Sequence, residues 1–327
     1  MPAIIAQEVT KEYRIPQRGH QLGSYLRTLF TPSYHTIRAL NAVSFTIEPG
    51  ETVGYIGLNG AGKSTTVKLL TGILAPTSGR VEVAGVDPHR ERVTNARRIG
   101  VVFGQRSQLL WDLPVRETFQ LLRHVYRVPP QCYQANTRRF FELLGLDAIW
   151  DQPVRLLSLG QKMRCELAAA FLHDPSVVYL DEPTIGLDVL AKATIREFLK
   201  QISVRTQVTV FLTTHDLRDI EEVCRRVILI HQGSVVYDGS PQKLVQEYGQ
   251  KARLEVEVVG DVVPTAPPGA RLAGRNGNRW VFTFDRQQVR VPELLAALGQ
   301  TLAIRDLTVT ELDLEGVVRR IYGGEAL

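Results

Sequence analysis

Short runs of alternating apolar and polar residues occupy the first 50 or so residues of the chain, as in Ile4-Ile5-Ala6 and Val43–Ile47. Such alternation is typical of antiparallel strands with one buried and one exposed face. Four later runs are short, continuously apolar and rich in β-branched residues: Val53–Ile56, Ile99–Phe103, Val177–Leu180 and Val208–Leu212. This pattern predicts parallel strands buried on both faces. Helical segments separate these runs, so we expect an α/β core beside a small antiparallel β-layer.

The hydrophobic pattern changes twice more along the chain. Between Gln105 and Asp174 the apolar spacing becomes helical, which predicts a helical subdomain inserted into the sheet at about 106–175. After Tyr248 there follow a proline-rich loop, a predicted hairpin at Asn276-Gly277-Asn278 and one amphipathic helix near Pro292–Leu298. We therefore expect a main domain over residues 1–245 and a small accessory α/β domain over 250–327.

The composition is that of an ordinary globular protein, with 44% hydrophobic and 22% charged residues. No apolar run approaches the ~18 residues needed to cross a bilayer, and the amino-terminal residues lack the features of a secretory signal, so we expect a cytosolic protein. Cys132, Cys165 and Cys224 form no CxxC pair, which argues against a disulfide framework or a zinc site. A net charge of +5 is too small to indicate nucleic-acid binding.

The strongest chemical signal is the sequence GLNGAGKS from Gly57 to Ser64, which matches the phosphate-loop pattern GxxxxGK[ST] between a predicted strand and a predicted helix. Glycines let backbone N–H groups turn towards a polyphosphate, and the helix start adds partial positive charge. Lys63 would reach the terminal phosphates, and Ser64 would coordinate Mg²⁺. The alternative, a glycine-rich turn that only starts a helix, is disfavoured by this context. The predicted phosphate-binding residues are Gly57, Asn59, Gly60, Gly62, Lys63, Ser64 and Thr65.

An acidic pair, Asp181 and Glu182, follows the strand Val177–Leu180 at the edge where open parallel sheets place their ligand sites. Asp181 would hold Mg²⁺ directly or through water, and Glu182 would polarise an attacking water as a general base. An acidic pair at a strand end is more often a helix cap or a solvated turn. Beside a phosphate loop, however, it indicates nucleotide hydrolysis.

These residues resemble the nucleotide-binding subunits of ABC transporters, and the resemblance covers about residues 1–245. Further motifs of that family occur in the family's order along the chain. Tyr13 matches the aromatic position that stacks on adenine, Gln105 matches the Q-loop, and His215 matches the switch histidine. Leu157-Ser-Leu-Gly-Gln161 matches the signature sequence, and Ile185-Gly-Leu-Asp188 matches the D-loop.

The resemblance implies a P-loop ATPase that uses ATP and Mg²⁺. Its catalytic residues would be Glu182, His215 and Gln105, and its Mg²⁺ ligands would be Ser64, Gln105 and Asp181. A lone histidine at a strand end is more often structural. His215, however, follows Val208–Leu212 at the same sheet edge as Lys63, Gln105 and Asp181, so all four could converge on one γ-phosphate.

The signature segment implies a dimer. Ser158 and Gly160 precede a helix predicted from Met163 to Leu172, so they could offer a hydroxyl, a backbone N–H and a positive helix end to a phosphate. In the family that phosphate belongs to ATP held by the other protomer, which is a second copy or a paralogue in a head-to-tail dimer. The residues that match positions near this nucleotide are Ser158, Gly160, Gln161 and Asp188. Leu159 stands where glycine is common in the family, but the flanking Ser158, Gly160 and Gln161 are retained. We therefore expect the signature segment to be functional.

The segment Asp181–Asp188 and the carboxyl-terminal segment Leu314–Tyr322 look like those of ABC-2 type exporter ATPases. The resemblance implies a peripheral subunit at the cytoplasmic face of the inner membrane, working with separate transmembrane permease subunits that bind the substrate. Translation factors with two cassettes and repair ATPases with long coiled coils also belong to the family, but neither feature occurs here. The alternative is a soluble regulatory or ribosome-associated ATPase without a permease. A scaffold without turnover is disfavoured, because Asp181, Glu182, Gln105 and His215 are all present.

A basic insertion is predicted at about residues 14–38. No acidic residue occurs between Glu12 and Glu48, whereas four arginines do: Arg14, Arg18, Arg27 and Arg38. One helical face would carry Leu22, Tyr25, Leu26, Leu29 and Phe30. The segment resembles an insertion of polysaccharide-exporting relatives. Our hypothesis is a short amphipathic helix that contacts anionic headgroups or the permease; the open alternative is a helix that packs on its own β-layer.

Overall fold

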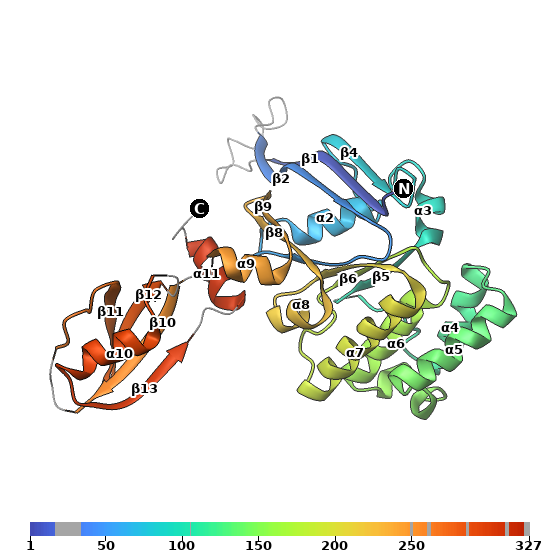
Figure 1. Cartoon of the computed structure of the whole chain (residues 1–327). Helices are drawn as coiled ribbons and strands as arrows, with labels where there is room; N and C mark the ends of the chain where they lie inside the picture. The colour runs from blue at the N-terminus through green and yellow to red at the C-terminus, as the bar shows by residue number, and fades with distance from the viewer. Residues whose placement is uncertain are drawn as a thin grey trace, which may run out of the picture. The chain divides into compact units, whose positions relative to one another are not determined.

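The computed structural model describes residues 1–16, 34–104, 106–248, 251–259, 263–285, 288–310 and 314–323. The chain divides into two compact units, Met1–Asp238 and Gly239–Leu327 (Figure 1). This division lies before the boundary expected near 245–250, because helix α9 (Pro241–Tyr248) belongs to the second unit, where it packs against α11 (Leu314–Gly323).

A six-stranded sheet in the order β5-β6-β7-β3-β8-β9 forms the centre of the first unit. Its strands are β3 (Thr52–Ile56), β5 (Ile99–Phe103), β6 (Val177–Asp181), β7 (Thr209–Thr213), β8 (Arg226–His231) and β9 (Ser234–Gly239). The pairs from β5 to β8 are parallel, and every residue of β3 and β7 is buried, as their continuous apolar sequences require. The predicted parallel α/β core is confirmed, although β8 and β9 were not predicted.

An antiparallel sheet in the order β2-β1-β4 forms a second layer of the same unit, as predicted for the first 50 or so residues. Its strands are β1 (Ile4–Pro16), β2 (Tyr34–Ile47) and β4 (Ser78–Val83). Aromatic rings join this layer to the central sheet: the ring centroids of Phe45 and Tyr55 are 5.9 Å apart, and those of Tyr55 and Phe211 are 5.0 Å apart. Helix α2 (Lys63–Leu70) contacts both sheets.

Three helices occupy the predicted helical subdomain: α4 (Val115–Val125), α5 (Pro130–Leu144) and α6 (Leu159–Phe171), with short 3-10 turns at Asp147–Ile149 and Val154–Leu156. Helix α6 packs on β5 and contacts α4 and α5. The other helices in the described part of the unit are α3 (Arg92–Arg98), α7 (Val189–Thr206) and α8 (Leu217–Val223). Helix α7 contacts α5 and α8, so it links the helical part to the loops after β6 and β7.

The second unit is a four-stranded antiparallel sheet in the order β11-β12-β10-β13. The strands are β10 (Lys251–Val258), β11 (Ala270–Asn276), β12 (Arg279–Asp285) and β13 (Ile304–Thr310). Helix α10 (Val291–Gly299) packs Leu294 and Leu298 against Leu254 and Phe282 of the sheet. The β11–β12 hairpin turns at Gly277, with φ at 60°, and α10 lies where the sequence predicts a helix, whereas α11 was not predicted.

The described flanks of the basic insertion are strands, because β1 extends to Pro16 and β2 begins at Tyr34. Arg14 pairs with Thr36 in this ladder, and the Arg38 guanidinium lies 2.9 Å from the Glu12 carboxylate. The two flanks of the predicted insertion therefore pair as strands, and the short helix predicted within it falls on residues outside the described ones. The other residues named for it lie outside the described residues: Arg18, Leu22, Tyr25, Leu26, Arg27, Leu29 and Phe30.

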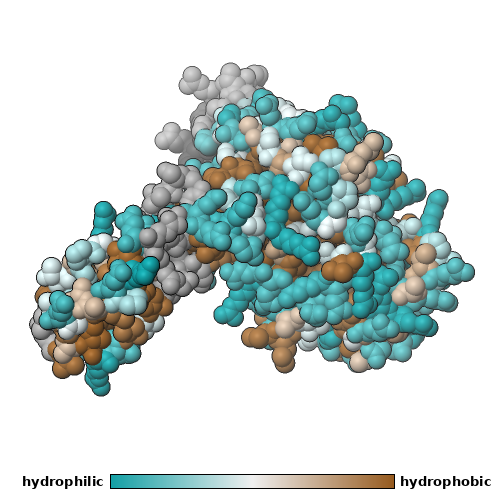
Figure 2. All heavy atoms as spheres, viewed as in Figure 1, coloured by the Kyte–Doolittle hydropathy of each residue, from teal (hydrophilic) through white to brown (hydrophobic). Residues whose placement is uncertain are grey.

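Hydrophilic residues cover most of the face shown in Figure 2, and hydrophobic residues form separate patches on it. Within the described ranges, no helix has the length and apolar character needed to cross a membrane. Cys165 and Cys224 are buried free thiols, while Cys132 is exposed.

Candidate active site

The carboxyl ends of four parallel strands meet at one edge of the central sheet. Phe103 lies beside Asp181, Asp181 beside Thr213, and Thr213 beside Tyr55. The phosphate loop follows β3, the acidic pair lies at the end of β6, and His215 follows β7. Because such edges hold the ligands of open parallel sheets, three separate sequence motifs come together at one ligand-binding position.

The phosphate loop, residues 57–64, is closed by its own lysine. Lys63 Nζ donates to the backbone oxygens of Gly57, at 2.6 Å, and Leu58, at 3.3 Å. The Lys63 side chain is buried, and burial lowers the pKa of its ammonium, while the carboxylates of Glu182 and Asp181 oppose that shift. The ammonium therefore lies within electrostatic reach of both acidic residues.

Gly62 lets the phosphate loop approach β2. Its φ of 113° is in the left-handed region, and a Cβ at this position would lie 2.6 Å from Leu40 Cδ2 and 2.8 Å from the Ala39 oxygen. Gly60 also has a positive φ, of 83°, but a Cβ there would meet nothing within 4 Å. The loop is thus pressed against β2 on one side and open on the other.

Tyr13, the predicted adenine-stacking residue, lies on β1 beside Ile37 of β2. The Lys11 ammonium is 5.4 Å from the centroid of the Tyr13 ring. Ala39 and Leu40, farther along β2, contact the phosphate loop, so the strand pair that carries Tyr13 borders that loop.

Asp181 is oriented by its neighbour in the sheet. The Thr213 hydroxyl donates to Asp181 Oδ1 at 2.5 Å, and the Gly104 N–H donates to the Asp181 backbone oxygen at 3.0 Å. Ser64 is exposed in the first turn of α2. A hydroxyl and a carboxylate are oxygen donors of the kind that Mg²⁺ prefers, so these residue types fit that ion.

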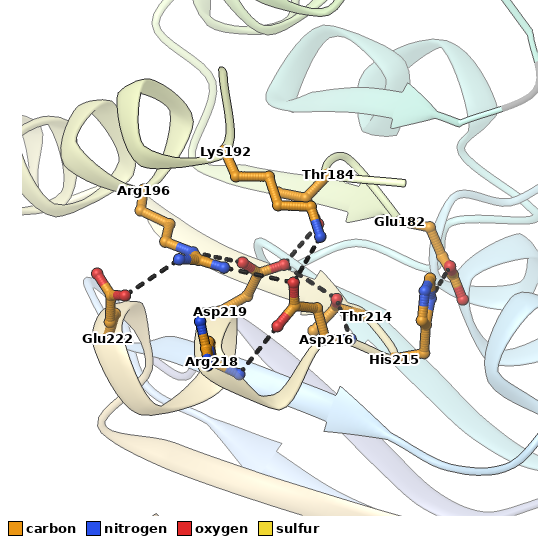
Figure 3. Close-up of polar contacts among 10 residues, drawn as sticks. All are labelled: Glu182, Thr184, Lys192, Arg196, Thr214, His215, Asp216, Arg218, Asp219 and Glu222. Atoms are coloured by element: carbon orange, nitrogen blue, oxygen red, sulfur yellow. Dashed lines mark hydrogen bonds and ion pairs between the residues drawn. The ribbon is translucent and has the colours of Figure 1, made fainter. Parts of the chain in front are cut away.

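Glu182 and His215 contact each other directly (Figure 3), with Glu182 Oε2 2.6 Å from His215 Nδ1. When Glu182 is ionised, its carboxylate can only accept, and the donor in this hydrogen bond is then His215 Nδ1. Glu182 has a φ of 57°, which is uncommon for a residue other than glycine, and its N–H donates to the Thr213 oxygen at 2.9 Å. A constrained turn thus directs Glu182 towards His215.

The signature segment begins helix α6 earlier than predicted, at Leu159 rather than near Met163. Ser158 Oγ accepts the Gln161 N–H at 3.2 Å, and the Gln161 side-chain oxygen accepts the Ser158 N–H at 2.8 Å. This reciprocal capping box satisfies two backbone donors at the helix start. Gly160 and Gln161 therefore lie inside the first helical turn of α6. The partial positive charge at the start of this helix is thus located at the signature segment itself.

The D-loop, residues 185–188, lies against the signature segment of the same chain. A Cβ at Gly186 would be 3.3 Å from Leu159 Cδ2, and one at Gly160 would be 3.0 Å from Ala191 Cβ. Asp188 Oδ1 accepts the Ala191 N–H at 2.8 Å and so caps α7. Leu159, the departure from the usual motif, therefore packs beside the D-loop and is 54% exposed.

Known proteins are similar to this chain in sequence. The family model described as "ABC transporter" matches residues 40–185. The Nod factor export ATP-binding protein I of Burkholderia lata is 36% identical over 267 residues, which cover 74% of this chain and 87% of that protein. This chain belongs to the ABC transporter family. The methionine import ATP-binding protein MetN 2 of Enterococcus faecalis is 31% identical over 284 residues, 82% of this chain and 80% of that protein.

The ABC fold is also that of a solved dimeric structure of the ATP-binding cassette MJ0796 in a post-hydrolysis state bound to ADP and Pi. The TM-score is 0.59 at 25% identity, over 72% of this chain and 98% of that chain. Family membership makes this protein an ATP-binding, ATP-hydrolysing subunit of an ABC transporter.

Sequence reasoning missed several residues of this ABC site. Gln105 lies outside the described residues, so its predicted roles stay predictions. Thr184, Thr213, Thr214 and Asp219 were not predicted, although all four are buried polar residues. The signal available was the position of the threonines, which lie within two residues of Glu182 or His215. Threonine is also an ordinary residue at the end of a strand, so this signal was weak.

Proposed function

We propose that Glu182 is the general base of ATP hydrolysis and that His215 orients it. The Glu182–His215 hydrogen bond, at the sheet edge that also presents Lys63, is the observation that carries this proposal. Glu182 Oε2 is occupied by His215, which leaves Oε1 to accept a proton from water. The water oxygen then attacks the γ-phosphorus, the bond to the β–γ bridging oxygen breaks, and ADP and phosphate leave.

The phosphate loop would bind the polyphosphate. Backbone N–H groups of residues 57–65 and the start of α2 would hold the β- and γ-phosphates, and Lys63 would move from its backbone acceptors to the phosphate oxygens. Ser64, Asp181 and Gln105 would hold Mg²⁺, which would neutralise charge that develops on the phosphates. The Tyr13 ring would stack on adenine.

A head-to-tail dimer would complete each site. Ser158, Gly160, Gln161 and Asp188 would then face ATP bound by the other protomer, with the capped start of α6 directed at its γ-phosphate. The similar cassette MJ0796 is dimeric in its solved structure, which supports this arrangement. Closure on ATP binding and opening after hydrolysis would drive the transport cycle.

The catalytic assignment is tested by Glu182→Gln and Lys63→Ala in an ATPase assay combined with nucleotide-binding measurements. Glu182→Gln should keep ATP binding and slow hydrolysis by about 10²–10⁴-fold, the usual contribution of a general base. Lys63→Ala should abolish productive ATP binding. Normal hydrolysis by the Glu182→Gln variant would contradict the role of Glu182.

We further propose that the subunit drives export through separate permease chains at the cytoplasmic face of the membrane. The relative named for Nod factor export is 36% identical and the relative named for methionine import is 31% identical, so identity favours export. Peripheral attachment agrees with the lack of a membrane-crossing helix in the described ranges.

Purification of the Glu182→Gln variant with ATP from gently solubilised native membranes tests the partner. Recovery of a multi-span membrane protein in stoichiometric amount would support the permease, and its reconstitution in vesicles would give the transport direction. Recovery of ribosomes or of only soluble proteins would instead favour the regulatory ATPase without a permease.

A further inference from the structure

The carboxylate of Asp219 on α8 lies among the side chains of Thr184, Arg196 and Thr214 (Figure 3). The residue is 1% exposed. None of the roles assigned above uses it. A buried carboxylate is costly unless charged and hydrogen-bonding groups compensate it, so its partners indicate what it does.

Asp219 accepts hydrogen bonds from three different segments. Thr184 Oγ1 donates to Oδ2 at 2.5 Å, and Thr214 Oγ1 donates to the same oxygen at 3.1 Å. Arg196 Nε, on α7, donates to Oδ1 at 2.6 Å. Both carboxylate oxygens are therefore engaged, and each segment is fixed relative to the other two.

The three residues that donate to Asp219 lie close in sequence to Glu182 and His215 or on the helix that follows the D-loop. Thr184 immediately precedes the D-loop and lies two residues after Glu182, and Thr214 is adjacent to His215. Arg196 belongs to α7, the helix that Asp188 caps, so it links Asp219 to the helix that follows the D-loop. Asp219 thus binds the residue that precedes the D-loop, the helix that follows it, and the residue adjacent to His215.

The nearby carboxylate of Asp216 supports this arrangement. Its N–H donates to Thr214 Oγ1 at 3.0 Å, which uses that oxygen as an acceptor and directs its proton to Asp219. Its Oδ2 accepts Lys192 Nζ at 2.7 Å and the Arg196 guanidinium at 3.4 Å. Two cationic side chains of α7 therefore balance two carboxylates of the segment after His215.

We propose that Asp219 is a positioning residue that sets the alignment of Glu182 with His215 and the placement of the D-loop. The proposal rests on the hydrolytic roles proposed above for Glu182 and His215. In this proposal Asp219 acts by holding Thr184 and Thr214, and the contacts to ATP and to the attacking water are left to the residues assigned above. Misplacement of a catalytic group by about 1 Å can cost about 10²-fold in rate, so loss of these hydrogen bonds should affect turnover more than binding.

The test compares Asp219→Asn with Glu222→Gln by ATPase kinetics and ATP binding. In Asp219→Asn an amide NH2 replaces one of the two accepting oxygens, so at least one of the three hydrogen bonds to this residue is lost. We expect kcat to fall about 10–100-fold while KM and ATP affinity change less than about twofold. Glu222 is the matched control, because it accepts from Arg196 Nη1 at 3.1 Å at the outer end of the same network. Glu222→Gln should keep kcat within about twofold of the natural protein.

Thr184 supplies a second pair of variants in case Asp219→Asn does not fold. Thr184→Val removes the hydroxyl at similar volume and should lower kcat, whereas Thr184→Ser keeps it and should restore kcat. A structural role alone would not link the rate to the hydroxyl with ATP affinity unchanged. Unchanged kcat in Asp219→Asn, or in Thr184→Val, would overturn the proposal.

Single-turnover hydrolysis in the Glu182→Gln background tests the positioning role of Asp219 separately from the general-base role of Glu182. If Asp219 acts through Glu182, adding Asp219→Asn to Glu182→Gln should slow hydrolysis far less than Asp219→Asn does alone. Full additivity of the two losses would overturn the positioning role. If Glu182→Gln itself hydrolyses ATP normally, the proposed general base fails; if it is slow while the Asp219 and Thr184 variants are normal, only this inference fails.

Discussion

The two sides of the nucleotide site are built in different ways. On the phosphate-loop side, backbone geometry and the lysine of the same short segment determine the structure, through the positive φ of Gly62 and the bonds from Lys63 to backbone oxygens. On the carboxylate side, side chains from α7 and from the loops that follow β6 and β7 converge on Asp219 of α8. A local motif therefore specifies the first side, whereas tertiary packing specifies the second.

The difference predicts where single substitutions should be most damaging. A change in the phosphate loop alters the backbone path itself, so it should disturb folding and binding together. A change on the carboxylate side should alter the orientation of one group and leave the nucleotide bound.

The largest effect is expected for Gly62→Ala. A φ of 113° strains any other residue by about 1–3 kcal/mol, and a Cβ would also lie 2.8 Å from the Ala39 oxygen, which belongs to backbone and cannot rotate away. We expect a lower free energy of unfolding and loss of ATP binding. Chemical denaturation and titration with a fluorescent ATP analogue measure the two.

Gly60→Ala is the matched comparison for this substitution. Its φ of 83° carries a similar backbone strain, but its Cβ would meet nothing within 4 Å. The free energy of unfolding should therefore fall less than for Gly62→Ala. Equal losses would show that contact with β2 contributes little and that backbone strain alone explains the requirement for glycine.

An intermediate effect is expected for Thr213→Val on the carboxylate side. Thr213 is buried, and its hydroxyl orients Asp181 through a 2.5 Å hydrogen bond. Loss of a residue that orients a metal ligand typically weakens metal binding by about 10–100-fold, so the Mg²⁺ concentration for half-maximal ATPase activity should rise by that factor. Thr213→Ser keeps the hydroxyl and should retain the natural Mg²⁺ requirement. An unchanged requirement in Thr213→Val would mean that Asp181 needs no such support.

The same contrast explains what the sequence could predict. The phosphate loop and the strands β3, β5, β6 and β7 were predictable, because local spacing and continuous apolar runs determine them. The hydrogen-bond network around Asp219 was not, because an aspartate in the first turn of a helix usually caps that helix or faces solvent. The early start of α6 was missed because the capping box in Ser158–Gln161 lies inside a motif interpreted as a phosphate contact.

The smallest effect, a change in unfolding free energy with pH, is expected for Glu166→Gln. Glu166 lies on α6, so this substitution extends the comparison to the helical part. Glu166 is buried and accepts from Ser107 Oγ at 2.5 Å and from the Gln108 N–H at 3.1 Å, so it holds the loop after β5. Burial raises its pKa above the ordinary value of 4.5, although the bonds from Ser107 and Gln108 oppose the shift. The ionised form is therefore less favourable in the folded protein than in the unfolded chain.

Glu166→Gln should make that cost visible as a dependence on pH. Because the folded pKa is raised, the natural protein should lose stability as pH rises from about 4.5 through the folded pKa, whereas glutamine has no proton to lose. The difference in unfolding free energy between the two proteins should thus grow with pH in favour of the variant. Glu166→Ala should be less stable than Glu166→Gln by about 1–3 kcal/mol at any pH, because neither variant titrates at this position and only alanine leaves the Ser107 hydroxyl and the Gln108 N–H without their acceptor. A difference between natural protein and Glu166→Gln that is flat from about pH 4 to 8 would show that Glu166 stays ionised without cost, so that its hydrogen bonds fully offset its burial.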